Sequence, residues 1–209
     1  MRSESLFGDL GLAERMSSMF VDIRDAQATS RAIADFAPDI VFHLAAQAFV
    51  RPSYADPAAT FATNVVGTAH VIEATQRVPA ARAIVCVTSD KCYDNPETGQ
   101  PFVETDPMGG HDPYSASKGA AEIVAASYRR AILQPAGGPR LATARAGNVI
   151  GGGDRSADRL VPDLVRAYAA GQAPVLRNPE AVRPWQHVLE PLRGYLRLGL
   201  GLLNGGDVE

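Results

Sequence analysis

The sequence has little of several features that assign a chain to a special class of protein. Its two cysteines, Cys86 and Cys92, fit no metal-binding or redox spacing, so a reducing, cytoplasmic setting is expected. No apolar run reaches the roughly 20 residues that cross a bilayer, and the acidic first residues do not resemble a signal peptide. A net charge of −3 offers no electrostatic basis for binding nucleic acid or an anionic membrane. We therefore expect neither nucleic acid nor a membrane as a partner.

Metal-ligand spacing is missing as well, and so is a glycine-rich turn near the start. His111 and His187 have no companions at ligand spacing, and no metal is implied.

Dinucleotide-binding folds open with a strand, a Gly-x-Gly-x-x-Gly turn and a helix, whose N–H groups hold the pyrophosphate. The glycines at 151–153 come late in the chain, and we expect them in a turn on the substrate side. The last predicted helix, over 188–203, has little to pack against. We therefore expect both ends of a larger fold to be absent.

What the sequence does contain is an alternation of apolar strands and helices. Asp25 and Asp112 are predicted to cap helices, the second together with Pro113. This alternation is typical of an α/β protein with a doubly wound parallel sheet and helices on both faces. Beyond Gly147 the pattern changes to a helix near 158–170, a short strand at 174–176 and the final helix. The strands predicted before that point are 19–21, 39–46, 83–88 and 141–146, and the helices are 25–36, 58–76 and 112–133.

Tyr114 and Lys118 are the first candidates for chemistry. They lie four residues apart at the start of a predicted helix and so share one face. A nearby cation favours the charged form of a phenol and lowers its pKa from the usual value of about 10. The alternative is an ordinary amphipathic helix with a half-buried Tyr and a solvated Lys. The polar cluster at 88–91 favours the functional interpretation, because open α/β sheets bind ligands at the carboxyl ends of their strands.

Four motifs occur together with that pair. They are VTSDKCY at 87–93, PMGGHDPY at 107–114, RAGNVIGGGD at 145–154 and RPWQHVLE at 183–190. With them, residues 5–201 resemble the extended short-chain dehydrogenase/reductase family, and within it the nucleotide-sugar 4,6-dehydratases. The resemblance implies a partial NAD-binding, Rossmann-like domain at 1–147 that lacks its first βαβ segment. Residues 148–209 would then form the start of a small substrate-binding lobe.

The same resemblance implies NAD as the cofactor. Asp22 and Ile23 would hold its adenine end, and Asn64 would support the site from a helix or be a plain polar helix position. A segment at the end of a strand would pass beneath the cofactor, where small side chains let the backbone approach. The alternative is a buried strand end without a cofactor role, and a buried strand end is compatible with both. The residues of this segment are Leu44, Ala45, Ala46 and Gln47.

In the reaction that the resemblance implies, Tyr114 removes the proton of the sugar 4-hydroxyl while NAD takes the C4 hydride. Lys118 would tune Tyr114 and bind the nicotinamide ribose. Ser89 would hydrogen-bond the C4 oxygen, and Asp90 would protonate the departing C6 hydroxyl. Lys91 stands where commoner dehydratases carry Glu. This substitution resembles the branch of the family that acts on CDP-glucose, which serves deoxysugar and lipopolysaccharide O-antigen biosynthesis. Lys91 would be the C5 base if its pKa is depressed, or would hold Asp90 or the substrate electrostatically, or would be a solvated strand-end residue.

On the substrate side, Asn148 and Arg183 would contact the nucleotide sugar, a guanidinium being suited to a pyrophosphate; Arg183 could equally be a surface loop residue. Arg155 departs from the aromatic residue of the family pattern. A 4-epimerase would share Tyr114 and Lys118 but would need no acid and base at 90–91, and an inactive remnant is a third alternative. The family implies a homodimer of the full-length protein. Without a glycine turn, we expect this chain by itself to bind NAD poorly.

Overall fold

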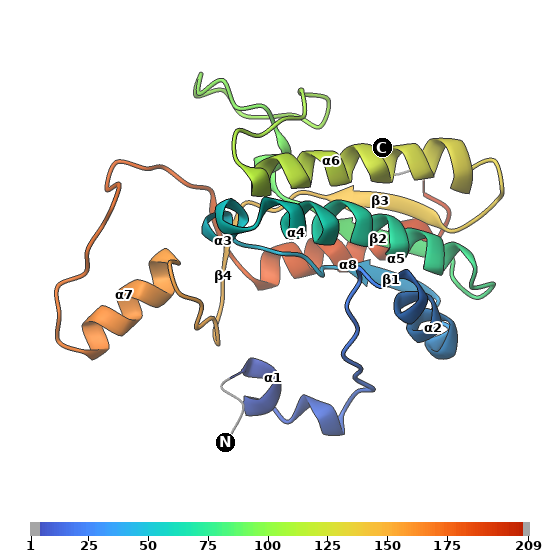
Figure 1. Cartoon of the computed structure of the whole chain (residues 1–209), viewed down its shortest axis with the longest axis horizontal. Coiled ribbons are helices and arrows are strands. Elements are labelled where there is room, and N and C mark those ends of the chain that lie inside the picture. The colour runs from blue at the N-terminus through green and yellow to red at the C-terminus, as the bar shows by residue number, and fades with distance from the viewer. Residues whose placement is uncertain (1–4, 207–209) are drawn as a thin grey trace. The chain divides into compact units, whose positions relative to one another are not determined.

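The computed structural model describes residues 5–206, which fall into two compact units. One unit contains residues 5–19 and Gly147–Pro191, and the other contains Phe20–Ala146 and 192–206. Figure 1 shows the elements of both. Each unit is described by itself, beginning with the larger one, which holds the sheet and most of the predicted site.

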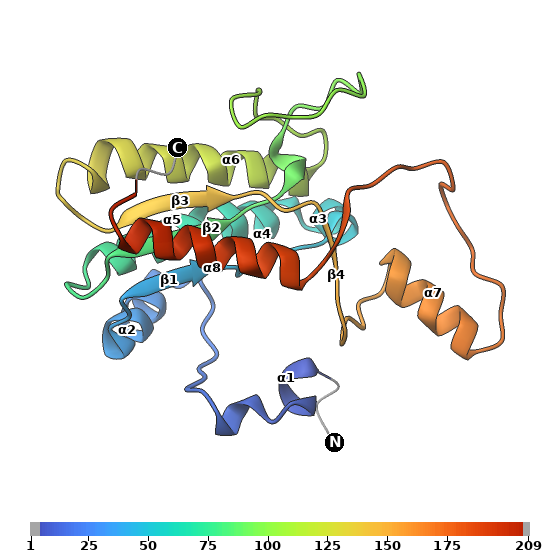
Figure 2. The ribbon, with the colours of Figure 1, turned by 180° about the vertical axis from the view of Figure 1, so that it is seen from behind.

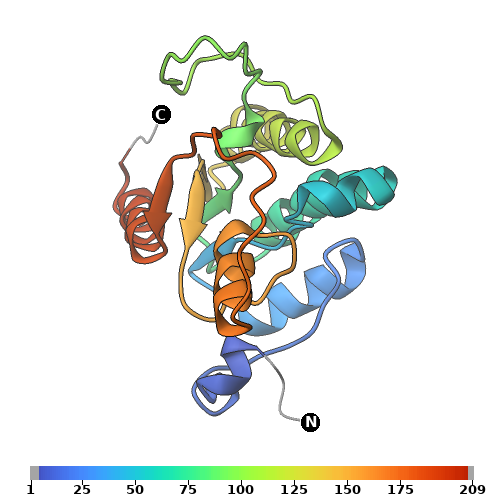
Figure 3. The ribbon, with the colours of Figure 1, turned by 90° about the vertical axis from the view of Figure 1, so that its left-hand side faces the viewer.

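The larger unit contains a parallel sheet of three strands in the order β1-β2-β3. The strands are β1 (Ile40–His43), β2 (Ala83–Val87) and β3 (Arg140–Ala144), and their register places Phe42 beside Val85 and Val85 beside Ala142. Helices cover both faces of this sheet (Figure 2 and Figure 3). The predicted α/β class with a doubly wound parallel sheet is confirmed, with strands shorter than expected.

Alternate residues of β2 point to opposite faces and build two cores. Ile84 and Cys86 pack with Ile72 of α5 (Gly67–Gln76) and Ala125 of α6 (Pro113–Tyr128). Helix α2 (Ala26–Phe36) packs beside α5.

On the opposite face, Ala83 and Val85 pack with Leu202 of helix α8 (Leu189–Leu203). Gly199 of α8 faces Ile40 and Phe42, and a Cβ there would lie 2.6 Å from Ile40 Cδ1. The expectation that the last helix has little to pack against is therefore wrong. Its apolar stripe covers the back of the sheet, and this long-range contact is invisible in a local pattern.

The predicted caps start the helices as expected. Asp25 accepts a hydrogen bond from the Ala28 N–H, and Asp112 accepts one from the Ser115 N–H, with Pro113 in the first helical position. The predicted helix over 58–76 is continuous but changes type. It consists of α4 (Pro57–Phe61), a π-helical turn (Ala62–Val66) and α5. A second π-helical turn (Arg129–Leu133) extends α6, and the short helix α3 (Val50–Ala55) precedes α4.

The smaller unit differs most from the prediction. It contains α1 (Leu6–Asp9), a 3₁₀ turn (Leu12–Glu14), α7 (Leu160–Ala169), and the strands β4 (Asn148–Ile150) and β5 (Trp185–His187), which pair in parallel. The strand predicted at 174–176 does not form. The pairing of Asn148 with Trp185 joins segments far apart in sequence, which a local pattern cannot reveal.

The strand predicted at 19–21 does not form either. Phe20 is fully exposed, and none of the described residues pairs with this segment. A strand needs a neighbour for its N–H and C=O groups, so a short apolar run alone does not make one.

The compact units divide the chain differently from the predicted boundary at 147/148. Residues 192–206 belong with the sheet, because the apolar side chains of α8 are buried there. Within the described residues, no helix is long and apolar enough to span a membrane.

Candidate active site

Ser89 and Asp90 lie in a tight turn just beyond the carboxyl end of β2. Ser89 begins a 3₁₀ turn (Asp90–Cys92), and its Oγ accepts a hydrogen bond from the Lys91 N–H at 3.2 Å. The same hydroxyl donates to Asp90 Oδ1 at 3.0 Å, while the Asp90 N–H donates to the carbonyl of Ala146. These bonds fix the direction of the Ser89 hydroxyl and tie the turn to the chain beyond β3.

Tyr114 and Lys118 occupy the first two turns of α6, as the spacing predicted. The Tyr114 N–H donates to Oγ of the buried Ser53 at 3.1 Å, which anchors the start of the helix. Lys118 is only 6% exposed, so the alternative of a solvated lysine is wrong. Burial lowers the pKa of Lys118, and this is opposed by the nearby Cys86 and Glu122. Lys118 Nζ lies 3.4 Å from the Val87 carbonyl, at the end of β2.

Lys91 and Lys118 are the only two lysines in the sequence, and both belong to the predicted site. Lys91 is exposed, in contrast to Lys118. Its role as base or as electrostatic contact stays a prediction.

Asn64 joins the predicted cofactor segment to helix α6. It lies buried in the π-helical turn, accepts from the Gln47 N–H at 2.8 Å and donates to the Gln47 carbonyl at 3.0 Å. Its Nδ2 also donates to Oγ of Ser117, which neighbours Lys118. Leu44, Ala45 and Ala46 leave β1 without strand pairing just before this anchor. Asn64 thus joins Gln47 to Ser117 of α6. Support of a cofactor site by Asn64 and cofactor contact by this segment stay predictions.

Asp22 and Ile23 precede α2 and do not close a strand. Both Asp22 carboxylate oxygens accept from Arg24, whose hydrogen bonds lower the Asp22 pKa to about 2. The Ile23 side chain covers Gly67, and a Cβ added at Gly67 would lie 2.7 Å from Ile23 Cδ1. The Ile23 carbonyl lies 2.9 Å from His70 Nδ1. The segment is therefore held against α5, and its adenine contact stays a prediction.

Asn148 and Arg183 belong to the smaller unit. The Asn148 N–H donates to the Pro184 carbonyl at the start of the β4–β5 pair, and Arg183 is exposed with Nη1 on the Val182 carbonyl. This exposure suits a ligand contact and a surface loop residue equally, so substrate contact by both residues stays a prediction.

Sequence reasoning missed a buried ion pair, Glu122 with Arg145, next to the Ser89–Asp90 turn. Glu122, only 5% exposed, accepts from Arg145 Nη2 at 2.9 Å and from Thr143 Oγ1 at 2.8 Å. Its other oxygen accepts from the hydroxyl of Thr88, the neighbour of Ser89. The available signal was the spacing, because Glu122 follows Lys118 by four residues just as Lys118 follows Tyr114.

Arg145 extends this network to the segment beyond the catalytic turn. Its Nη1 donates to Tyr93 Oη at 2.8 Å and to the Glu104 carbonyl at 3.0 Å, and its guanidinium lies 4.9 Å from the centre of the Tyr93 ring. Tyr93 in turn stacks on Phe102 at 4.5 Å. One guanidinium therefore holds three separate parts of the chain.

His43 is a buried neutral group at the end of β1. Its Nε2 lies 3.0 Å from Thr68 Oγ1, and the Thr68 hydroxyl donates its own proton to the Asn64 carbonyl, so the imidazole must be the donor. Burial, followed by the charge of Lys118, lowers the His43 pKa from 6.5 to about 4.

This lowered pKa predicts an acid-dependent loss of stability. Below pH 6.5, His43 takes up a proton in the unfolded chain. In the folded chain it stays neutral until the pH approaches 4. The stability that His43 contributes is therefore complete above pH 6.5 and falls toward pH 4. Between pH 7.5 and 5, the free energy of unfolding should fall by about 2 kcal/mol more in the wild type than in His43→Gln.

Urea unfolding at the two pH values measures this difference. Gln retains a donor near the Nε2 position, and His187→Gln controls for loss of an exposed imidazole. Equal pH dependence in wild type and His43→Gln would show that His43 charges freely in the folded state.

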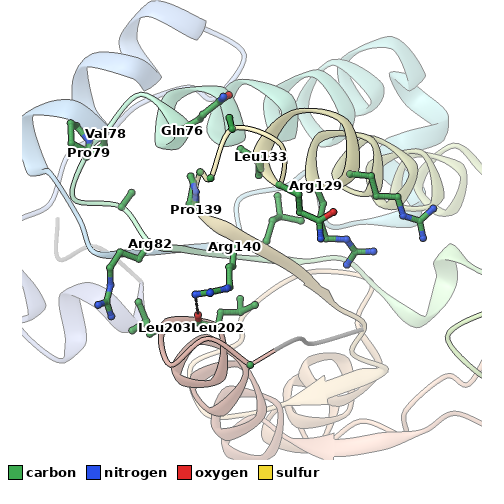
Figure 4. A pocket seen from close by; sticks show the side chains of 18 residues that line it. Gln76, Val78, Pro79, Arg82, Arg129, Leu133, Pro139, Arg140, Leu202 and Leu203 are labelled. Atoms are coloured by element: carbon green, nitrogen blue, oxygen red, sulfur yellow. Dashed lines mark hydrogen bonds between the residues drawn. The ribbon is translucent and has the colours of Figure 1, made fainter.

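A depression of about 1370 Å³ lies at the opposite edge of the sheet (Figure 4). It lies at the amino ends of β2 and β3 and is lined by residues that include Arg82, which precedes β2, Arg140, the first residue of β3, and Leu202 of α8. Because ligands of open α/β sheets bind at the carboxyl ends of the strands, it is not the candidate active site. Among the described residues, no group of three or more His, Cys, Asp or Glu could hold a metal ion.

Comparison with known proteins shows which family the chain resembles. The family described as GDP-mannose 4,6 dehydratase matches residues 2–198. The chain belongs to this family. It is 50% identical over 206 residues to the CDP-glucose 4,6-dehydratase of Salmonella typhimurium, covering 97% of this chain and 57% of that protein. It is 30% identical to the dTDP-glucose 4,6-dehydratase of Shigella flexneri, covering 91% of this chain and 56% of that protein. The chain thus spans little more than half the length of these dehydratases.

Solved structures of related enzymes share the fold. The dTDP-glucose 4,6-dehydratase DesIV of Streptomyces venezuelae, with NAD and TYD bound, aligns with a TM-score of 0.75 at 28% identity, over 89% of this chain and 54% of that one. The UDP-glucose 4-epimerase of Thermus thermophilus in complex with NAD aligns with a TM-score of 0.71 at 27% identity, over 87% of this chain and 58% of that one. Dehydratases and epimerases therefore share this framework, and the side chains of the site must separate them.

Proposed function

We propose that this chain carries the catalytic residues of a nucleotide-sugar 4,6-dehydratase whose substrate is CDP-glucose. The observation that carries the proposal is that the Ser89–Asp90 turn and the Lys118 ammonium both lie at the end of β2. Lys118 belongs to helix α6, whose first turn contains Tyr114. The 50% identity to a CDP-glucose 4,6-dehydratase supports the choice of substrate.

Each residue has one task in this proposal. Tyr114 takes the proton of the sugar 4-hydroxyl, and the ammonium of Lys118 favours the phenolate form that this step needs. The Ser89 hydroxyl binds the C4 oxygen. Once C4 is a ketone, the C5 proton is acidic, and Asp90 is the candidate donor of a proton to the departing C6 hydroxyl, which leaves as water. Lys91 is the candidate acceptor of the C5 proton, a base that an epimerase does not need.

The described residues fit the nicotinamide half of NAD. The Lys118 ammonium has three N–H groups, and its one recorded acceptor among residues 5–206 is the Val87 carbonyl at 3.4 Å, which leaves donors for ribose hydroxyls. Leu44, Ala45 and Ala46 would lie beneath the cofactor, with Gln47 fixed by Asn64. When bound, NAD accepts the hydride from C4 and returns it to C6. The pyrophosphate half has no Gly-x-Gly-x-x-Gly turn in this sequence, so weak binding is expected.

The substrate lobe and the dimer belong to the same proposal. Asn148 and Arg183 would bind the nucleotide sugar, with the guanidinium on its pyrophosphate. Two copies would pair through α6 and the helices before it. Ile123 of α6 is 62% exposed, and Phe61 and Val66 are also exposed, which supports an apolar contact there.

The test is incubation of the chain with CDP-glucose and NAD at several millimolar. Alkaline absorbance reports the 4-keto sugar, and mass spectrometry reports loss of one water. A 4-keto-6-deoxy product from CDP-glucose, formed faster than from dTDP-glucose, is the expected result. An isomer of unchanged mass would identify an epimerase, and no turnover of either sugar would contradict catalysis by this chain.

A further inference from the structure

One face of helix α6 carries an apolar residue of the core near the helix end and ionisable residues toward the helix start. Ala125 lies in the core with Ile84 and Cys86, Glu122 is one turn nearer the helix start, and Lys118 and Tyr114 follow at spacings of four. The face that the proposed chemistry uses therefore continues directly into the Glu122 network.

Glu122 connects this helix to the strand that ends at the catalytic turn. One carboxylate oxygen accepts from the Thr88 hydroxyl, and the next residue is Ser89, whose Oγ bonds the Lys91 N–H. The Thr88 N–H donates to the Ala144 carbonyl on β3 at 2.9 Å. The end of β2 is thus fixed from the sheet by its backbone and from α6 by Glu122.

Arg145 stabilises the carboxylate of Glu122, which is buried. A buried carboxylate without a partner is costly, whereas Glu122 accepts three hydrogen bonds, one of them from a guanidinium. Burial opposes the charge of Arg145, but hydrogen bonds with Glu122 and Tyr93 outweigh it and raise the Arg145 pKa. Arg145 is therefore held in the charged form beside Glu122.

We propose that Glu122 is a positioning residue that locks the end of β2, and with it Ser89, against helix α6 through its bonds to Thr88 and Arg145. The inference rests on the proposed function for the role of Ser89. Its test measures the folded chain without turnover, so the two proposals can fail separately.

The same carboxylate also acts on Lys118, one helical turn away. Glu122 and Cys86 on β2 favour the protonated form, which burial opposes. The other titratable groups around Lys118 are His43 on β1, whose pKa responds to the lysine charge, and Tyr114 on α6 itself. Removing the charge of Glu122 should therefore lower the Lys118 pKa further, which a purely space-filling residue would not do.

The lysine composition makes the experiment specific. Lysine labelled with ¹³C and ¹⁵N gives signals from Lys91 and Lys118 only, and Lys91→Arg assigns them. The Lys91 amide reports on Ser89, because it donates to Ser89 Oγ. The Lys118 side-chain titration reports its pKa.

Thr88→Val should move the Lys91 amide signal, because it removes the bond between β2 and Glu122. Thr143→Val is the matched control. It removes the other threonine hydroxyl from the same carboxylate, on β3 and away from Ser89, and should leave the Lys91 signal in place. Glu122→Gln should lower the Lys118 pKa.

Circular dichroism confirms that each variant is folded. If Glu122→Gln does not fold, Glu122→Asp replaces it; it keeps the charge and shortens the reach, so the Lys91 amide should move. Equal Lys91 shifts in Thr88→Val and Thr143→Val would overturn the proposal. An unchanged Lys118 pKa in Glu122→Gln, or an unmoved Lys91 amide in Glu122→Asp, would also overturn it.

Discussion

Tyr114→Phe should lower the rate of 4-keto sugar formation from CDP-glucose by about a thousandfold, the usual contribution of a positioned acid or base. The substitution removes the phenol oxygen, which takes the 4-hydroxyl proton in the proposed mechanism, and retains the ring. The backbone anchor is also unchanged, because it is the Tyr114 N–H that donates to Ser53. A thousandfold loss corresponds to about 4 kcal/mol of transition-state stabilisation.

Initial rates at saturating NAD and substrate measure the effect. Tyr54→Phe is the matched control, since Tyr54 lies exposed on α3 and loses the same hydroxyl. Retention of more than a tenth of the rate in Tyr114→Phe would assign the proton transfer to another group.

Gly110→Ala should destabilise the larger unit by about 4 kcal/mol, from backbone strain and close contact together. Gly110 has a φ of +137°, which residues with a Cβ rarely adopt. An added Cβ would lie 2.5 Å from Ala116 N and from the Ser115 carbonyl carbon, both in the first turn of α6. The start of the helix would have to move, and Tyr114 would move with it.

Gly137→Ala separates the cost of backbone strain from the cost of close contact. Gly137 also has a positive φ, +62°, but a Cβ there would meet nothing within 4 Å. Strain alone should cost about 1 kcal/mol. Urea unfolding of both variants measures the difference, and equal costs would mean that the first turn of α6 adapts without loss.

Much of this arrangement was predictable because its determinants are local. Asp25 and Asp112 cap helices through side chains that reach three residues along the chain. Apolar runs gave three of the predicted strands, and a spacing of four placed Tyr114 and Lys118 on one face. The motifs at 87–93 and 107–114 led to the dehydratase family, which the comparisons confirmed.

The failures have a common physical origin in pairing between distant segments. The run at 19–21 is as apolar as a strand but finds no paired neighbour within the described residues, while Asn148 and Trp185 pair across 37 positions. Helix α8 has no partner nearby in the sequence, and its leucines pack against Ala83 and Ala142 of the sheet.

By itself, the sequence determined the fold class, the caps, the family and the candidate residues, since these depend on side-chain chemistry and short spacings. Only the tertiary structure decided that Lys118 is buried and that Glu122 holds Thr88, Thr143 and Arg145 together. Burial and buried ion pairing depend on which distant segments exclude water from one another, and this property belongs to the packed chain.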